Sequence, residues 1–165
     1  MPFTPFHFGF AILLFSIFTF LDPIALLIGC VIIDLEPIFY LLFGVGQLHG
    51  IIHSFLGVII FVLPVSLLSW LSFRWFNLER YFKPFNPYIS LLSGLLGLVS
   101  HIFFDTIIYS EMMFWFPFSR VQGVLYGSWS SNTDYIVLTA MFGAGVVILC
   151  ARFLIKKQKK KRLSN

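Results

Sequence analysis

Seven ionisable side chains lie inside or beside long apolar stretches of this chain. They are His7, Asp34, Glu36, His49, His53, His101 and Asp105, and they include every histidine in the sequence. A charged aspartate near the centre of a bilayer costs at least about 2.5–3.5 kcal/mol, so each such group is a candidate for function. A single histidine in a helix bundle is more often a hydrogen-bonded packing residue than a ligand, but seven polar groups together favour a site.

Two pairs of these residues have the spacing of one helical turn. His49 and His53 are four residues apart, and so are His101 and Asp105. Residues at this spacing share one face of an α-helix, where two of them can hold one ion. We therefore expect each pair to act together.

Asp34 and Glu36 have a spacing that does not suit a regular helix. They are two residues apart, which places them on different sides of it. Pro37 removes a helical hydrogen bond and disfavours α geometry at the residue before it. The sequence therefore predicts a locally opened turn at Asp34–Pro37, through which both carboxylates could reach one site.

The residue types indicate a metal centre. Imidazole and carboxylate ligands without cysteine suit Zn²⁺, Mn²⁺ or Fe²⁺, and the set is large enough for one or two ions. The expected ligands are His7, Asp34, His53, His101 and Asp105. Glu36 and His49 are expected as further ligands or as a general base. Such a metal lowers the pKa of bound water and polarises an ester oxygen.

The composition requires lipid around these groups. Of the 165 residues, 59% are hydrophobic and 11% are charged, whereas soluble domains carry about 25% charged residues. The sequence predicts an all-α integral membrane protein, with one domain over residues 1–155 and a basic tail over 156–165. Its bundle of about five transmembrane helices is expected at Phe6–Leu21, Pro23–Phe43, Ile51–Phe76, Tyr88–Tyr109 and Tyr135–Ile155. The first stretch is short of the roughly 20 residues that a span needs.

Basic residues predict the orientation. No lysine or arginine precedes Arg74, and six of the eleven lie in residues 156–162. The positive-inside rule then places the tail, and the loop with Arg80 and Lys83, in the cytoplasm. We expect the tail to touch anionic lipid head groups rather than nucleic acid. In a multi-pass protein of the cell membrane, this orientation sends the polar groups of four helices, and the N-terminus, to the outer side.

The residues of the expected site also resemble the YdjM-like family of membrane-bound metal-dependent hydrolases. The matching segments are Pro5-Phe6-His7, Asp34-Leu35-Glu36-Pro37, Leu48 to Gly57, His101-Ile102-Phe103-Phe104-Asp105 and Trp115-Phe116-Pro117-Phe118. In the family's second block, Leu48 replaces a histidine and His49 replaces an arginine, so the role of His49 is less secure than that of His53.

That family is in turn similar to the zinc-dependent phospholipase C and nuclease P1 group, all-helical proteins that cut phosphodiesters with clustered zinc ions. The resemblance implies hydrolysis of a phosphoester of a lipid or lipid-linked substrate, with zinc as the first choice of metal. It covers roughly residues 1–125.

Two other functions use the same residues. A transporter or ion-conducting protein could use the cluster as a cation or proton site, although the sequence shows no inverted repeat and few polar residues continue a path to the cytoplasm. A noncatalytic membrane scaffold could use the polar groups to hold the bundle together. Tyr109 and Glu111 are expected as interfacial or capping groups.

Overall fold

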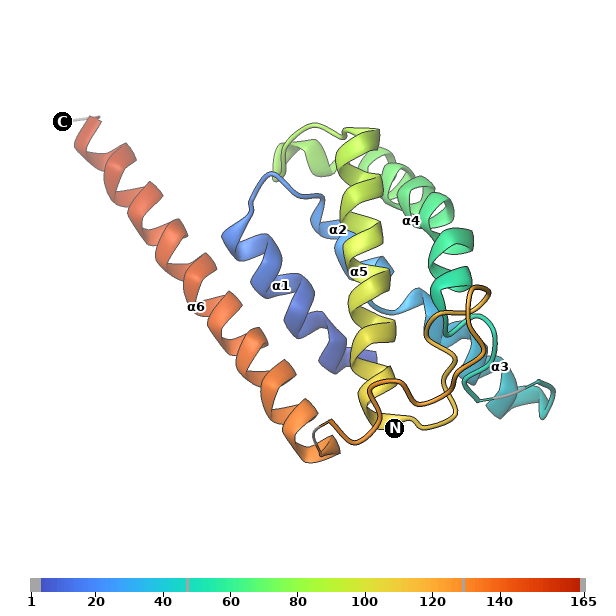
Figure 1. Ribbon diagram of the computed structural model, residues 1–165. Coiled ribbons are helices and arrows are strands. Elements are labelled where there is room, and N and C mark those ends of the chain that lie inside the picture. Colours follow the sequence, from blue (N-terminus) through green and yellow to red (C-terminus); the bar gives the residue numbers. More distant parts are fainter. Residues whose placement is uncertain (1–3, 47, 129, 164–165) are drawn as a thin grey trace.

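The computed structural model describes residues 4–46, 48–128 and 130–163. All regular secondary structure in these residues is helical, which confirms the predicted all-α class (Figure 1). The α-helices are α1 (Phe8–Ile17), α2 (Pro23–Gly29), α3 (Leu35–Phe43), α4 (Phe55–Phe76), α5 (Pro87–Ile108) and α6 (Ser131–Leu163). The described residues also form three short 3₁₀ helices: η1 (Thr4–His7), η2 (Ile32–Asp34) and η3 (Leu78–Arg80).

Among the described residues, four segments are long and apolar enough to cross a membrane. They are Pro23–Phe43, Phe55–Phe76, Pro87–Ile108 and Asn132–Lys159. The first predicted stretch forms α1, whose ten residues extend only about 15 Å, half the thickness of the hydrocarbon core. The described part of the chain is therefore an all-α membrane bundle with four segments able to span a membrane and one short apolar helix packed against them.

Helices α2 and α5 pack closely because glycines line their contact. A methyl group on Gly97 would lie 2.6 Å from the carbonyl oxygen of Leu26, and one on Gly29 would lie 2.7 Å from that of Gly94. Backbone meets backbone here, as in other membrane helix pairs with small residues at the interface. This contact fixes the end of α2 against the middle of α5.

Asp22 joins the start of α2 to the neighbouring helices. One carboxylate oxygen caps α2 by accepting the N–H groups of Ile24 and Ala25, and Pro23 occupies the first turn. The other oxygen accepts the hydroxyl of Ser69 on α4 at 2.6 Å, and the Asp22 N–H donates to Ser93 on α5. The Asp22 carboxylate therefore has a structural role.

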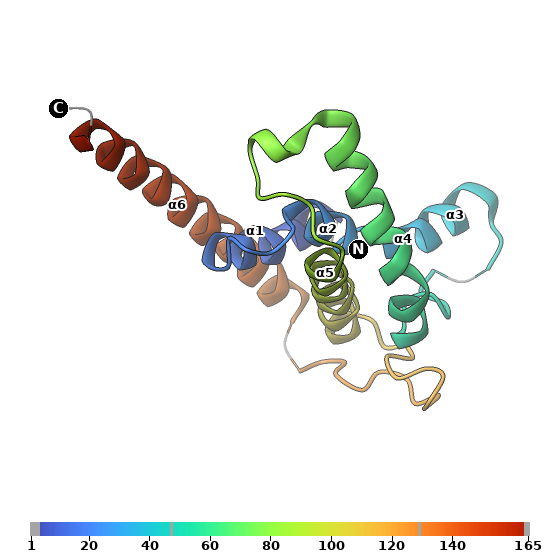
Figure 2. The same cartoon turned by 90° about the horizontal axis from the view of Figure 1, so that it is seen from above.

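Helix α6 lies on the flank of the bundle, beside α1 (Figures 1 and 2). Gly9 of α1 packs directly on the backbone of Leu138, and Gly145 of α6 packs on the backbone of Leu13. The helix continues without a break through the basic residues as far as Leu163. The predicted tail thus begins as a continuation of the last span.

Most of the basic residues gather at one end of the bundle, and Arg120, between α5 and α6, is the exception. The loop that contains η3 and the C-terminal end of α6 lie at the same end in Figure 1. Lys83 of that loop lines one cavity together with Arg152 and Lys156 of α6. This arrangement agrees with the positive-inside expectation, while the side of the membrane that this end faces stays a prediction.

Candidate metal centre

A break in the second span brings Asp34 into the bundle. Helix α2 ends at Gly29, η2 covers Ile32–Asp34, and α3 begins at Leu35. The predicted opening is therefore present, but it lies just before Asp34. Pro37 is the third residue of α3, where a missing N–H leaves no helical hydrogen bond unmade.

Helix α5 supplies His101 and Asp105 from one face, as their spacing predicts. The His101 Nε2 atom lies 3.2 Å from Oδ2 of Asp105, and both side chains are buried. On the other side of the ring, Nδ1 donates a hydrogen bond of 2.7 Å to the carbonyl oxygen of Cys30. Cys30 follows α2 directly, so the α2–α5 contact orients the imidazole.

His53 comes from a turn rather than from a helix. Residues 48–54 form turns and bends, and α4 begins only at Phe55, with Ser54 as its N-cap. The prediction that His49 and His53 share a helix face is therefore wrong. The chain turns here because the N–H groups of residues 50, 52 and 53 donate to a side chain instead of to helical carbonyls.

That side chain is Glu36. Its two carboxylate oxygens accept the N–H groups of Gly50, Ile52 and His53 at 3.1–3.2 Å. Oε2 also lies 2.7 Å from Nδ1 of His53. Glu36 therefore holds the turn and orients the His53 ring from behind. Its predicted role as a ligand or general base stays a prediction.

Four side chains converge on one point. Asp34, His53, His101 and Asp105 each offer a ligand atom, and these atoms all lie within 4.8 Å of one another. Oδ1 of Asp34 lies 3.8 Å from Nε2 of His53 and 3.4 Å from Nε2 of His101. Oδ2 of Asp105 lies 4.0 Å from Nε2 of His53. These residues could hold a metal ion.

The ring nitrogens at the centre of this cluster have no other hydrogen-bond partner. Nε2 of His53 and Nε2 of His101 are buried and make no hydrogen bond among the described residues. Their Nδ1 atoms are each engaged by an oxygen behind the ring. Metal-bound histidines show this arrangement, in which an outer oxygen fixes the tautomer and leaves the second nitrogen for the ion. The donor set therefore fits a divalent metal.

His7 lies beside the cluster. Its Nε2 atom is 3.3 Å from Oδ1 of Asp105, and its ring centroid is 4.4 Å from that of His101. The side chain is only 1% exposed. The structure thus brings His7 to the site, outside the group of four whose ligand atoms face one another. Its role as a ligand stays a prediction.

His49 is adjacent to the cluster and has a different partner. Its Nδ1 atom lies 3.0 Å from Oε1 of Glu111, and its ring lies 3.9 Å from the ring of Tyr109, between centroids. Its ring is also 5.0 Å from that of His53. Glu111 and Tyr109, expected only as interfacial groups, therefore border the site. The one sequence signal for Glu111 was an acidic residue in an otherwise aromatic segment.

The charges at this edge follow from burial and hydrogen bonding. Burial lowers the pKa of His49, and the hydrogen bond with Glu111 opposes this only in part. Partial burial raises the pKa of Glu111, but hydrogen bonds from its own backbone and from His49 outweigh burial and lower it. Burial lowers the pKa of His53, yet the neighbouring carboxylates of Asp34 and Glu36 outweigh burial and raise the pKa above that of an ordinary histidine.

A cavity of about 310 Å³ lies next to His49 and Glu111. Its other lining residues are Tyr40, Gly46, Leu48 and Gln122. The His49 ring lines this cavity and lies 5.0 Å from the His53 ring, between centroids, so the cavity is close to the cluster. It offers a place for a small polar group close to the candidate metal centre.

Comparisons with protein-family models, with curated proteins and with solved structures found no match to this chain.

Proposed function

We propose that this protein is a membrane-embedded, metal-dependent hydrolase that acts on a phosphoester of a lipid or lipid-linked substrate. The observation that carries the proposal is the convergence of Asp34, His53, His101 and Asp105 inside a membrane bundle. Burying two carboxylates and two imidazoles together is unfavourable unless they serve a bound ion or pair with one another. Both Nε2 atoms lie 3.2–4.0 Å from the two carboxylates without making a hydrogen bond among the described residues, which favours the bound ion.

In this proposal, each residue of the cluster has a role in binding the metal. Asp34, His53, His101 and Asp105 would hold the metal, and His7 is the nearest further candidate through its contact with Asp105. Imidazole and carboxylate ligands without cysteine suit zinc, manganese or iron, and the family resemblance makes zinc the first choice. A divalent metal bound there would supply Lewis acidity and an activated water. This set of residues could hold one ion or two, and the number of metal ions per protein molecule is therefore measured in the test.

The substrate class rests on position and on the family resemblance. Asp34, His101 and Asp105 lie in segments that can span a membrane, and His53 lies two residues before the next such segment. Helix α3, which begins beside Asp34, exposes apolar side chains such as Phe39 and Leu42. A substrate with acyl chains could reach the site from the bilayer along this helix. The resemblance to the YdjM-like family supports a phosphoester as the bond that is cut.

The test measures metal content and hydrolysis on the same samples. The full-length protein, purified in detergent after growth with zinc or manganese, should carry stoichiometric metal and hydrolyse a phospholipid or lipid-linked phosphoester. Mutating a residue that only hydrogen-bonds a metal ligand typically weakens metal binding by about 10–100-fold. His101→Ala and Asp105→Asn remove proposed ligands, so each should weaken metal binding by more than that. Glu79→Gln removes a carboxylate from η3, far from the cluster in the chain, and should behave as wild type.

Three results would contradict the proposal. Wild-type protein without any stoichiometric transition metal, even after supplementation, would exclude the metal centre. Metal-dependent cation flux through protein-containing liposomes, without hydrolysis, would favour the transporter. Lower stability of His101→Ala with unchanged metal content would favour the scaffold.

A further inference from the structure

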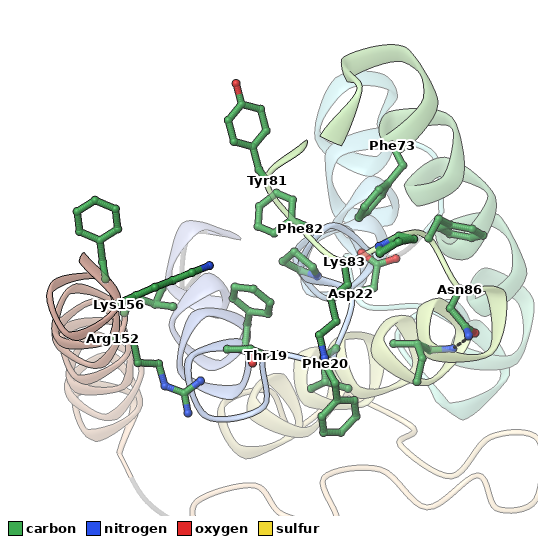
Figure 3. A pocket seen from close by; sticks show the side chains of 18 residues that line it. Thr19, Phe20, Asp22, Phe73, Tyr81, Phe82, Lys83, Asn86, Arg152 and Lys156 are labelled. Atoms are coloured by element: carbon green, nitrogen blue, oxygen red, sulfur yellow. Dashed lines mark hydrogen bonds between the residues drawn. The ribbon is translucent and has the colours of Figure 1, made fainter. Parts of the chain in front are cut away.

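A cavity of about 760 Å³ lies at the basic end of the bundle, away from the metal cluster. It is formed by α1, the 19–22 segment, the last turn of α4, the 81–86 loop, the first turn of α5, and α6 (Figure 3). Its volume is in the range of small-molecule and cofactor sites. Ile89 lines it, and His101 follows twelve residues later on α5, which separates the two sites by about 18 Å along the helix.

Three cations border this cavity. Lys83 comes from the loop before α5, whereas Arg152 and Lys156 are four residues apart on α6 and share a face. Figure 3 shows both α6 side chains projecting from the helix toward α1. Arg152 donates a hydrogen bond of 3.1 Å to the carbonyl oxygen of Ile17. Within the described residues, none of the three makes an ion pair with a carboxylate, so their charge is available to a ligand.

Asp22 is the one acidic residue of the lining, and it does not cancel these charges. Its carboxylate already accepts two backbone N–H groups and the Ser69 hydroxyl. It is 7% exposed, so it lies at the base of the cavity rather than at the rim with the lysines. The lining therefore keeps a net positive charge.

The remaining wall is apolar and mainly aromatic. Phenylalanine side chains come from five segments, namely α1, the 19–22 segment, α4, the 81–86 loop and α6: Phe15, Phe20, Phe73, Phe82, Phe85 and Phe153. The cavity also lies where α4 ends, α5 begins and the apolar part of α6 gives way to lysines. Cations above an apolar wall at the end of membrane spans match the two parts of a phospholipid, because the phosphate sits at the interface and the acyl chains below it.

We propose that this cavity binds one anionic phospholipid, with Lys83, Arg152 and Lys156 around its head-group phosphate and the phenylalanines against its acyl chains. The site is separate from the candidate metal centre, and it does not depend on the proposed hydrolase activity. Its ligand would be held as a bound lipid rather than converted.

Native mass spectrometry of the full-length protein in detergent tests this proposal. The probes are phosphatidylglycerol and phosphatidylcholine with the same acyl chains. We expect one phosphatidylglycerol to be retained with an affinity at least about fivefold above that of phosphatidylcholine. Removing one basic contact at a membrane surface costs about fivefold in affinity, so Lys83→Gln/Lys156→Gln should weaken phosphatidylglycerol binding roughly 25-fold.

The matched control is Lys157→Gln/Lys159→Gln, which removes the same charge from α6 outside the cavity lining. This variant should retain the lipid as wild type does. An equal loss in both double variants, or equal retention of both lipids, would overturn the proposal in favour of unspecific attraction. Displacement of the lipid by millimolar inorganic phosphate would show an anion site without acyl-chain recognition, which also contradicts it. Unchanged metal content and a monodisperse elution profile would show that the variants are folded.

Discussion

At the scale of single residues, the two histidines of the cluster use their rings in the same way. In His53 and in His101, Nδ1 meets an oxygen behind the ring, and Nε2 faces the common centre. The oxygens differ, because one belongs to the Glu36 carboxylate and the other to the Cys30 backbone. A carboxylate that accepts a hydrogen bond from a ligating imidazole raises the basicity of the imidazole. Glu36 should therefore strengthen metal binding through His53.

Replacing Glu36 with glutamine tests this indirect role. The amide keeps the shape of the side chain, but its NH₂ group cannot accept the hydrogen bonds that the lost oxygen accepted. We expect Glu36→Gln to weaken metal binding by about 10–100-fold, because the His53 ring and its turn lose their fixed orientation. Titration of the metal-loaded protein with a competing chelator measures this change.

Glu79→Gln is the matched control, since it makes the same chemical change in an exposed residue of η3. Its metal affinity should equal that of wild type. If Glu36→Gln kept full metal affinity and lost only hydrolysis, Glu36 would be the general base that its residue type suggested, and the positioning role would be wrong.

At the scale of helices, two departures from regular structure build the site. The interruption at residues 30–34 lets the second span present both a backbone carbonyl and Asp34 to α5. The turn before α4 presents His53, and Glu36 on α3 holds that turn. The irregular backbone is tolerated at this depth because side chains of neighbouring elements satisfy its polar groups.

The α2–α5 contact should be sensitive to a single methyl group. In Gly97→Ala, the new carbon would press on the Leu26 carbonyl, so the helices must separate. Overpacking of this kind costs about 1–3 kcal/mol, more than the roughly 1 kcal/mol that alanine contributes to helix propensity. We expect a lower melting temperature and weaker metal binding, because the Cys30 carbonyl would move away from His101.

Gly143→Ala provides the control, because a methyl group there meets nothing within 4 Å among the described residues. This substitution should leave stability unchanged or raise it by up to about 1 kcal/mol. Thermal unfolding of both variants in one detergent compares them directly. Equal effects at the two positions would show that the close contact does not hold the helices together.

At the scale of the whole molecule, the chain separates two ends of different chemistry. The candidate metal centre belongs to one half of the bundle, and the cavity with Lys83, Arg152 and Lys156 belongs to the other end. The α5 helix connects them, and α6 carries most of the basic residues away from the cluster (Figure 1). If the basic end is cytoplasmic, the cluster faces the outer leaflet.

Cysteine labelling tests that orientation. In a Cys30→Ser/Cys150→Ser background, Gln122→Cys lies beside the small cavity near His49, and Lys159→Cys lies near the end of α6. A membrane-impermeant maleimide should label Gln122→Cys in intact cells and Lys159→Cys only after the membrane is opened. The reverse pattern would place the cluster on the cytoplasmic side. Labelling of both from one side would show that α6 does not cross the membrane.

Much of this protein is determined by its sequence alone, because a helix in lipid satisfies its own backbone hydrogen bonds and needs only a long apolar segment. For that reason the Tyr88–Tyr109 prediction agrees with α5 to within one residue at each end. The pairing of His101 with Asp105 could also be predicted from the sequence, since residues four apart on one helix are always neighbours.

Only the tertiary structure decided which atoms meet across helices. The Cys30 carbonyl is 71 residues from His101, and Glu111 is 62 residues from His49, so no local spacing links them. The turn at His53 was predicted as helix, because a sequence pattern cannot show that the Glu36 carboxylate replaces helical carbonyls as the acceptor. These contacts depend on how closely and at what angle the helices pack, and that is a property of the assembled bundle rather than of any segment.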